Sequence, residues 1–119
     1  MTAALDSSVI VAALRDDEAF HRECFGLLQQ AGLHARPHAL AETFSTMTGG
    51  SLRGRVAADD VVCALKRSLL PRVTMVDLTS EEYLSAMGEA RARGIRGGAI
   101  YDYLHLVAAR KIGAARSTR

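Results

Sequence analysis

The stretch TAALDSSVIVAALR, residues 2–15, passes from a short apolar run through a polar turn into helical spacing. TAAL predicts a strand that ends at Asp6, and SSVIVAALR predicts a helix that is capped by Ser7 or Ser8. Proteins with parallel sheets bind their ligands just beyond the carboxyl ends of the strands. Asp6 is therefore the first candidate for a functional residue.

The next segments repeat this order of strand and helix. Residues 16–31 have the apolar spacing of an amphipathic helix, and Gly32 is expected to end it. LHAR, residues 33–36, is the second strand candidate. The following helix, PHALAETFSTMT, is predicted to have Pro37 in its first turn. These segments predict strand, helix, helix, strand and helix.

The second half of the chain continues the alternation. Residues 56–70 predict a helix that Pro71 ends, and RVTMVDL, residues 72–78, predicts a strand. Thr79 and Glu82 form a capping box for a helix through about residue 93, and a last helix is expected from about residue 98 to 111. Helices between successive short strands indicate an α/β fold with a parallel sheet.

Length and composition narrow the class of protein. The chain has 119 residues, so we expect a single domain over residues 1–119. Its 49% hydrophobic and 24% charged residues are typical of a globular protein rather than a disordered one. No apolar run is long enough for a membrane span, and no signal peptide is expected because Asp6 interrupts the first apolar stretch. Cys24 and Cys63 are expected to be reduced core residues of a cytoplasmic protein.

Positive charge is concentrated near the end of the chain. The net charge is only +2, yet residues 91–119 contain seven basic residues against one acid, Asp102. This asymmetry suggests a polyanionic partner, although a solvated basic face without a ligand explains it equally well.

Three acids stand among apolar residues and are expected to face a core: Asp6, Glu42 and Asp102. Each has its own structural explanation, because Asp6 can cap a helix, Glu42 can lie on a helix surface and Asp102 can pair with Arg96. All three, however, follow a strand or open a helix at what we expect to be one edge of the sheet. Clustered carboxylates repel each other, and Mg²⁺ or Mn²⁺ relieves that repulsion. The acids therefore predict a divalent metal site.

Three segments, LDSSVIVAAL, LAETFSTMTG and GGAIYDYLHLVAARKIGA, resemble in order and spacing the motif blocks of PIN-domain ribonucleases. The closest resemblance is to the VapC-type toxins of toxin–antitoxin pairs. It implies a three-layer α/β/α sandwich around a short parallel sheet. It also implies that Asp6, Glu42 and Asp102 bind the metal and that Ser7 or Ser8 positions a carboxylate or a metal-bound water.

The chemistry implied by this resemblance is hydrolysis of RNA phosphodiester bonds by a water that Mg²⁺ or Mn²⁺ orients and ionises. Basic residues near the cleft are expected to hold the RNA backbone; the candidates are Arg53, Arg55, Arg93 and Arg96. The implied partners are RNA, a cognate VapB-like antitoxin and a second copy of the chain in a homodimer, with no membrane. Residues 17–31 and 56–70 are candidate surfaces for the antitoxin.

The chain departs from the family pattern at its end. The family continues with a strand that carries a Thr and, close behind it, a fourth Asp or Asn, whereas GAARSTR ends at Arg119 and contains no acid. Thr118 is the candidate for that Thr, so the last strand is expected to be truncated. A trimmed product and a naturally short chain both explain this. The alternative function is a catalytically weak or inactive PIN-like module that binds an antitoxin.

Other residues give weaker signals. His34 and His38 are expected to straddle a junction between a strand and a helix, which makes a zinc site improbable. His105 is expected to be a partly buried helix histidine rather than a site residue. Tyr101 and Tyr103 are expected to pack in the core rather than to stack on bases.

Overall fold

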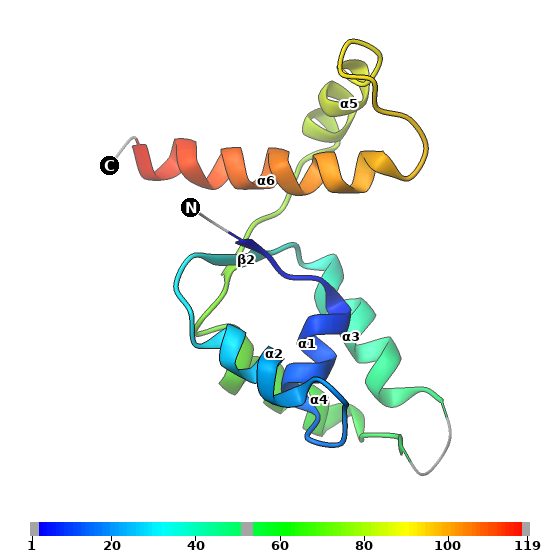
Figure 1. Cartoon of the computed structure of the whole chain (residues 1–119), viewed down its shortest axis with the longest axis vertical. Coiled ribbons are helices and arrows are strands. Elements are labelled where there is room, and N and C mark those ends of the chain that lie inside the picture. Colours follow the sequence, from blue (N-terminus) through cyan, green and yellow to red (C-terminus); the bar gives the residue numbers. More distant parts are fainter. Residues whose placement is uncertain (1–2, 51–53, 118–119) are drawn as a thin grey trace. The chain divides into compact units, whose positions relative to one another are not determined.

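The computed structural model describes residues 3–50 and 54–117 and has a mixed α/β fold with a short parallel sheet, as the sequence predicts (Figure 1). The chain divides into two compact units, Met1–Met75 and Val76–Arg119. Each unit is described separately below. The expectation of a single domain stays a prediction.

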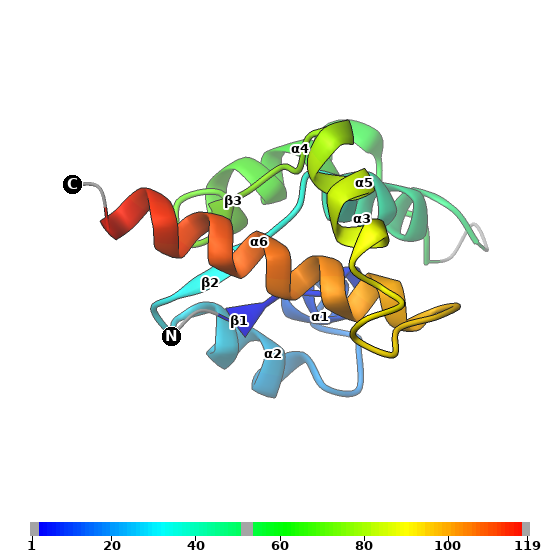
Figure 2. The same cartoon turned by 90° about the horizontal axis from the view of Figure 1, so that it is seen from above.

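The sheet of the first unit has three strands in the order β1-β2-β3 (Figure 2). These are β1 (Ala3–Ala4), β2 (Leu33–Ala35) and β3 (Thr74–Met75). Both pairings are parallel, with Ala3 opposite Leu33 and His34 opposite Thr74. The predicted strand RVTMVDL is shortened to β3 because Val76 and Leu78 pack in the core of the second unit instead.

The described residues of the first unit also form the α-helices α1 (Ser7–Leu14), α2 (His21–Leu28), α3 (His38–Thr48) and α4 (Ala58–Ala64). A π-helical segment, η2 (Leu65–Leu69), continues α4. Helix α1 packs against α2 and α3, and α3 packs against α4 (Figure 1). These contacts bury one core, which includes Leu5, Ile10, Leu28, Leu33, Met47, Val61 and Leu69.

Helix α2 begins later than the predicted residue 16. Residues 16–20 form turns, in which Arg15 pairs with Asp17 at 2.7 Å between Nη2 and Oδ2. Phe20 therefore precedes the helix and is 69% exposed, although its spacing placed it on the buried face. Interactions within these turns decide where α2 begins, and the spacing of apolar residues does not predict them.

The second unit consists of α5 (Ser80–Gly88) and α6 (Ala99–Ser117). The predicted capping box of α5 is confirmed: Thr79 Oγ1 accepts from Glu82 N at 3.1 Å, and Glu82 Oε1 accepts from Thr79 N at 2.9 Å. Val76, Leu78, Ala86, Tyr103, Leu104, Ala108 and Ile112 form the core of this unit. Tyr103 is buried as expected, whereas Tyr101 is 64% exposed.

Both helices of the second unit end at different positions from those predicted. Helix α5 ends at Gly88 rather than near residue 93, and turns follow it to Gly94, whose φ of 67° favours glycine. Helix α6 continues past Lys111 to Ser117, so residues 113–117 are helical and form no strand. Thr118, the candidate for the family's Thr, lies outside the described residues.

Two further expectations concern cysteines and membranes. Both cysteines are free, but Cys63 is exposed on α4 rather than buried in the core. In the described part of the chain, no helix is long and apolar enough to span a membrane.

Candidate metal centre and nucleic-acid surface

Asp6 lies between β1 and α1 and is the N-cap residue of α1, in place of the predicted Ser7 or Ser8. Its Oδ1 accepts from the backbone N–H of Ser8 at 3.2 Å and from Ser7 Oγ at 3.4 Å, and its Oδ2 accepts from Ser8 Oγ at 3.1 Å. The two oxygens of a carboxylate offer about four acceptor sites, so these donors leave capacity for a further partner. Asp6 is also exposed. A cation can therefore reach an aspartate whose orientation is already fixed.

The electrostatics of Asp6 favour its charged form. The backbone N–H of Ser8 is the main cause that lowers the pKa of Asp6; burial, the next largest cause, opposes it, and the Ser8 and Ser7 hydroxyls lower the pKa further. All these donors are neutral groups. Asp6 is therefore negatively charged at neutral pH, and no basic group among the described residues compensates this charge.

Glu42 lies in α3, the helix that follows β2, and β2 is the parallel neighbour of β1. The buried residues of α3 are Ala39, Thr43 and Met47, and the Glu42 side chain is 51% exposed. His38 Nε2 is 3.8 Å from Glu42 Oε1, one helical turn away. Because α3 packs against α1, Asp6 and Glu42 belong to adjacent elements of the first unit.

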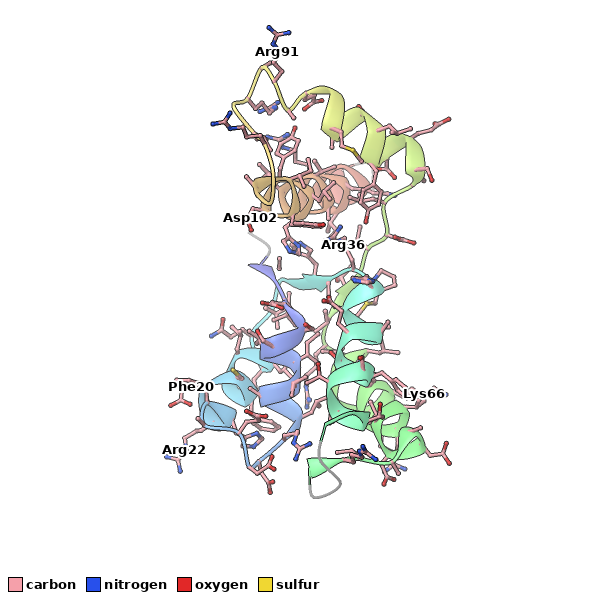
Figure 3. The ribbon with its side chains drawn as sticks, turned by 90° about the vertical axis from the view of Figure 1, so that its right-hand side faces the viewer. Phe20, Arg22, Arg36, Lys66, Arg91 and Asp102 are labelled. Atoms are coloured by element: carbon pink, nitrogen blue, oxygen red, sulfur yellow. The ribbon has the colours of Figure 1, made fainter. Side chains whose placement is uncertain are left out.

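Asp102 lies in the first turn of α6, in the second unit (Figure 3). It is exposed, and the structure shows no hydrogen bond or ion pair between its side chain and the residues that it describes. In particular, no ion pair with Arg96 is present among them. A carboxylate in the first turn of a helix is stabilised by the helix dipole, so Asp102 needs no basic neighbour.

All three acids are exposed, so the expectation that they face a core is wrong. Glu42 and Asp102 lie beside the buried face of their helices rather than on it, and Asp6 precedes its helix. On α6, for example, the buried residues are Tyr103 and Leu104. Neither unit by itself brings together three or more His, Cys, Asp or Glu side chains among its described residues. The assignment of Asp6, Glu42 and Asp102 to one metal site stays a prediction.

The predicted serines contact the predicted acid directly. Ser8 donates two hydrogen bonds to Asp6, one from its backbone and one from its hydroxyl, and Ser7 donates a longer one. The predicted metal ligands are all carboxylates, and the Asp6 carboxylate can accept a further partner. Carboxylate oxygens are the ligands that a hard divalent cation prefers.

The predicted RNA-binding arginines differ in their surroundings. Arg53 lies outside the described residues. Arg55 is exposed, and its Nε donates to the Gly50 carbonyl at 2.9 Å. Arg96 is exposed, whereas Arg93 Nε lies 3.2 Å from Glu89 Oε2 and its guanidinium lies 5.3 Å from the centre of the Tyr103 ring.

Sequence analysis missed the role of Glu89, which contacts both Arg93 and Tyr103. The Tyr103 hydroxyl donates to Glu89 Oε2, the oxygen that also contacts Arg93. Spacing of four residues between Glu89 and Arg93 on a predicted helix was a signal that could have identified the ion pair. The hydrogen bond from Tyr103 had no such signal, because it joins residues from different segments.

A pocket of about 370 Å³ lies between α5 and α6. Its wall on α6 is formed by Tyr103, Val107 and Arg110, and the opposite wall includes Glu82 and Ser85 of α5 and Glu89 just after this helix. Glu82 forms an ion pair with Lys111 Nζ at 2.7 Å, and Glu89 contacts Arg93 and Tyr103. The acids that line the pocket and contact these partners are therefore already paired within the second unit, and none of the three predicted metal ligands lines the pocket.

Comparison with known proteins assigns the family. The family model of the PIN domain matches residues 3–118, nearly the whole chain. A comparison with curated proteins finds no match. PIN domains have a nuclease-type fold, and they are generally metal-dependent nucleases that typically use divalent metals. Since the family model covers both units of the α/β fold described above, this chain belongs to the PIN domain family.

Proposed function

We propose that this PIN-domain protein is a metal-dependent endoribonuclease, and that it acts as the VapC-type toxin of a type II toxin–antitoxin pair. The observation that carries the proposal is the state of Asp6 at the carboxyl end of β1. Its carboxylate is exposed, oriented by Ser7 and Ser8, and charged, with no cationic partner among the residues that the structure describes. This is what a ligand for a divalent cation requires.

In the proposed mechanism, Asp6, Glu42 and Asp102 would hold Mg²⁺ or Mn²⁺. A bound ion would lower the pKa of a water and neutralise charge on the phosphoryl oxygens. Ser8 holds both oxygens of Asp6, so this ligand loses little side-chain freedom when it binds a cation. Exposed arginines, including Arg55 and Arg96, bind phosphates of the RNA backbone.

The proposal is tested by cleavage of single-stranded RNA with Mn²⁺. Asp6→Asn, Glu42→Gln and Asp102→Asn should each reduce the cleavage rate by at least about 100-fold, because loss of even an outer-shell partner of a metal costs 10- to 100-fold. The matched control is Asp59→Asn, an exposed acid in the first turn of α4, which should cleave like the unaltered chain. Cleavage that persists in Asp6→Asn contradicts the proposed site.

The proposed partners are RNA, a VapB-like antitoxin and a second copy of the chain, in the cytoplasm. Two aromatic side chains support a protein partner, since Phe20 is 69% and Phe25 46% exposed. Phe20 projects outward beside Arg22 at the start of α2 (Figure 3). Both phenylalanines belong to residues 17–31, one of the predicted antitoxin surfaces.

The same exposed residues favour a second candidate function, a PIN module that binds an antitoxin with little nuclease activity. The two candidates differ in their response to metal. Calorimetric titration with Mn²⁺ should detect binding if the chain is a nuclease. Antitoxin binding without any Mn²⁺ binding or RNA cleavage would favour the module.

A further inference from the structure

The segment between α5 and α6, residues 89–98, contains three arginines and is called the arginine loop here. It carries Arg91, Arg93 and Arg96, and two glycines with positive φ shape it: Gly94 at 67° and Gly97 at 60°. Arg91 projects outward from the tip of the loop (Figure 3). Arg91 and Arg96 are exposed, and the structure shows no ion pair for either among the residues that it describes. Both guanidinium groups are available to an anion.

Arg93 has different surroundings. Its Nε lies 3.2 Å from Glu89 Oε2, and the face of its guanidinium lies 5.3 Å from the centre of the Tyr103 ring. The Tyr103 hydroxyl donates to the same Glu89 oxygen. Arg93, Glu89 and Tyr103 therefore form a closed set of three contacts, which joins the loop to the first turns of α6.

The closed arrangement matters because a single exposed ion pair is weak. The side chains of Arg93 and Glu89 are 46% and 47% exposed, and such a pair alone exchanges easily with solvent ions. Here the aromatic ring adds a cation–π contact to the guanidinium, and the tyrosine hydroxyl fixes the carboxylate. A phosphate that approaches Arg93 must also approach the negative charge of Glu89.

We infer that Glu89 is a built-in counterion of the arginine loop: it compensates Arg93, so that phosphates of the RNA are bound by Arg91 and Arg96, while Arg93 and Tyr103 position the loop on α6. The sequence prediction placed Arg93 with the RNA ligands, and the inference removes it from that set. The inference rests on the proposed function for the identity of the anion.

The test counts the ions released when the full chain binds RNA. Binding of a fluorescent single-stranded RNA is measured by anisotropy in EDTA, which prevents cleavage, over a series of NaCl concentrations. The slope of log K against log[NaCl] changes by about 0.7 for each phosphate contact of a single strand. Arg91→Ala and Arg96→Ala should each reduce its magnitude by about 0.7.

Substitutions at Arg93 and Glu89 distinguish a compensated arginine from an RNA ligand. Arg93→Ala should leave the slope unchanged, whereas Glu89→Gln should increase its magnitude by about 0.7 because Arg93 is released to bind a phosphate. The double variant Glu89→Gln/Arg93→Ala should return to the slope of the unaltered chain. Glu81→Gln, an exposed acid in the first turn of α5, is the matched control for removal of a negative charge and should not change the slope.

The outcomes separate the inference from the proposed function. A reduced slope in Arg93→Ala, or an increase in Glu89→Gln that persists in the double variant, overturns the role of Glu89 while RNA binding stands. An unchanged slope in both Arg91→Ala and Arg96→Ala overturns their assignment as phosphate ligands. Failure of the unaltered chain to bind RNA at any salt concentration overturns the proposed function itself, and the inference with it.

Discussion

Asp6 at the start of α1 and Glu82 at the start of α5 are two carboxylates in similar positions with different partners. Each accepts a hydrogen bond from a backbone N–H at a helix N-terminus, Asp6 from Ser8 at 3.2 Å and Glu82 from Thr79 at 2.9 Å. Glu82 Oε1 is also bound by Lys111 Nζ at 2.7 Å. The other donors to Asp6 are the hydroxyls of Ser7 and Ser8.

The difference shows how the two acids are used. The pKa of Glu82 is lowered mainly by Lys111, so its charge is compensated within the protein. The pKa of Asp6 is lowered mainly by the backbone N–H of Ser8, a neutral group, so its charge is not compensated. Glu82 therefore has a structural role, whereas Asp6 stays available for the divalent cation of the proposed function.

The largest expected effect concerns the serine that orients Asp6. Ser8→Ala removes the hydroxyl donor to Asp6 Oδ2 and should lower the affinity for Mn²⁺ about 10-fold, the typical effect of losing an outer-shell partner. Ser80→Ala, a serine in the first turn of α5, should leave the affinity unchanged. Isothermal titration calorimetry measures both. Equal affinities for the two variants would show that the orientation of Asp6 has no role in metal binding.

A smaller effect concerns stability, in which the two helix starts should behave alike. Asp6→Ala and Thr79→Ala each remove an N-cap and should lower the free energy of unfolding by about 1 kcal/mol. Asp6→Asn should keep most of this stability, because asparagine is an equally good N-cap. Urea denaturation in EDTA tests this. If Asp6→Asn is destabilised as much as Asp6→Ala, the side chain of Asp6 does not act as a cap.

The smallest effect is the pH dependence that Glu82 and Lys111 contribute. Because folding lowers the pKa of Glu82 below its usual 4.5, the stabilisation is present above pH 4.5 and is lost as the pH falls through the folded value. Glu82→Gln keeps the capping-box acceptor and loses the charge. The difference in the free energy of unfolding between the unaltered chain and Glu82→Gln should therefore become smaller as the pH is lowered. A deficit that stays constant with pH would exclude the ion pair as its cause.

Strand and helix order was predictable because it depends on local patterns. The capping box of Thr79 and Glu82 was recognised from two residues, and β2 was recognised from the short segment LHAR that follows Gly32. The boundaries of α2 and α5 were not, because turns fixed by Arg15 and by Gly94 replace helical bonds that the apolar spacing allows. Propensity alone does not contain this information.

The candidate site was predictable in its residues and not in their surroundings. Asp6 stands out in the sequence, but its capping role depends on the extended backbone at that residue, with φ of −88° and ψ of 152°. Glu42 and Asp102 were placed among apolar neighbours, yet the buried stripes of α3 and α6 run beside them. A shift of one position around a helix separates a buried residue from an exposed one.

The shortness of the sheet has a consequence for how the first unit folds. Each strand pair joins segments that are distant in sequence: α1 and α2 lie between Ala3 and Leu33, and α3, α4 and η2 lie between His34 and Thr74. Pairing parallel strands that are so far apart in sequence has a high entropic cost of loop closure. The few hydrogen bonds between such short strands offset little of this cost. We therefore expect the helices to pack around Ile10 and Leu69 before the strands align. In this order of events, the edge from which Asp6 emerges is among the last parts of the unit to form.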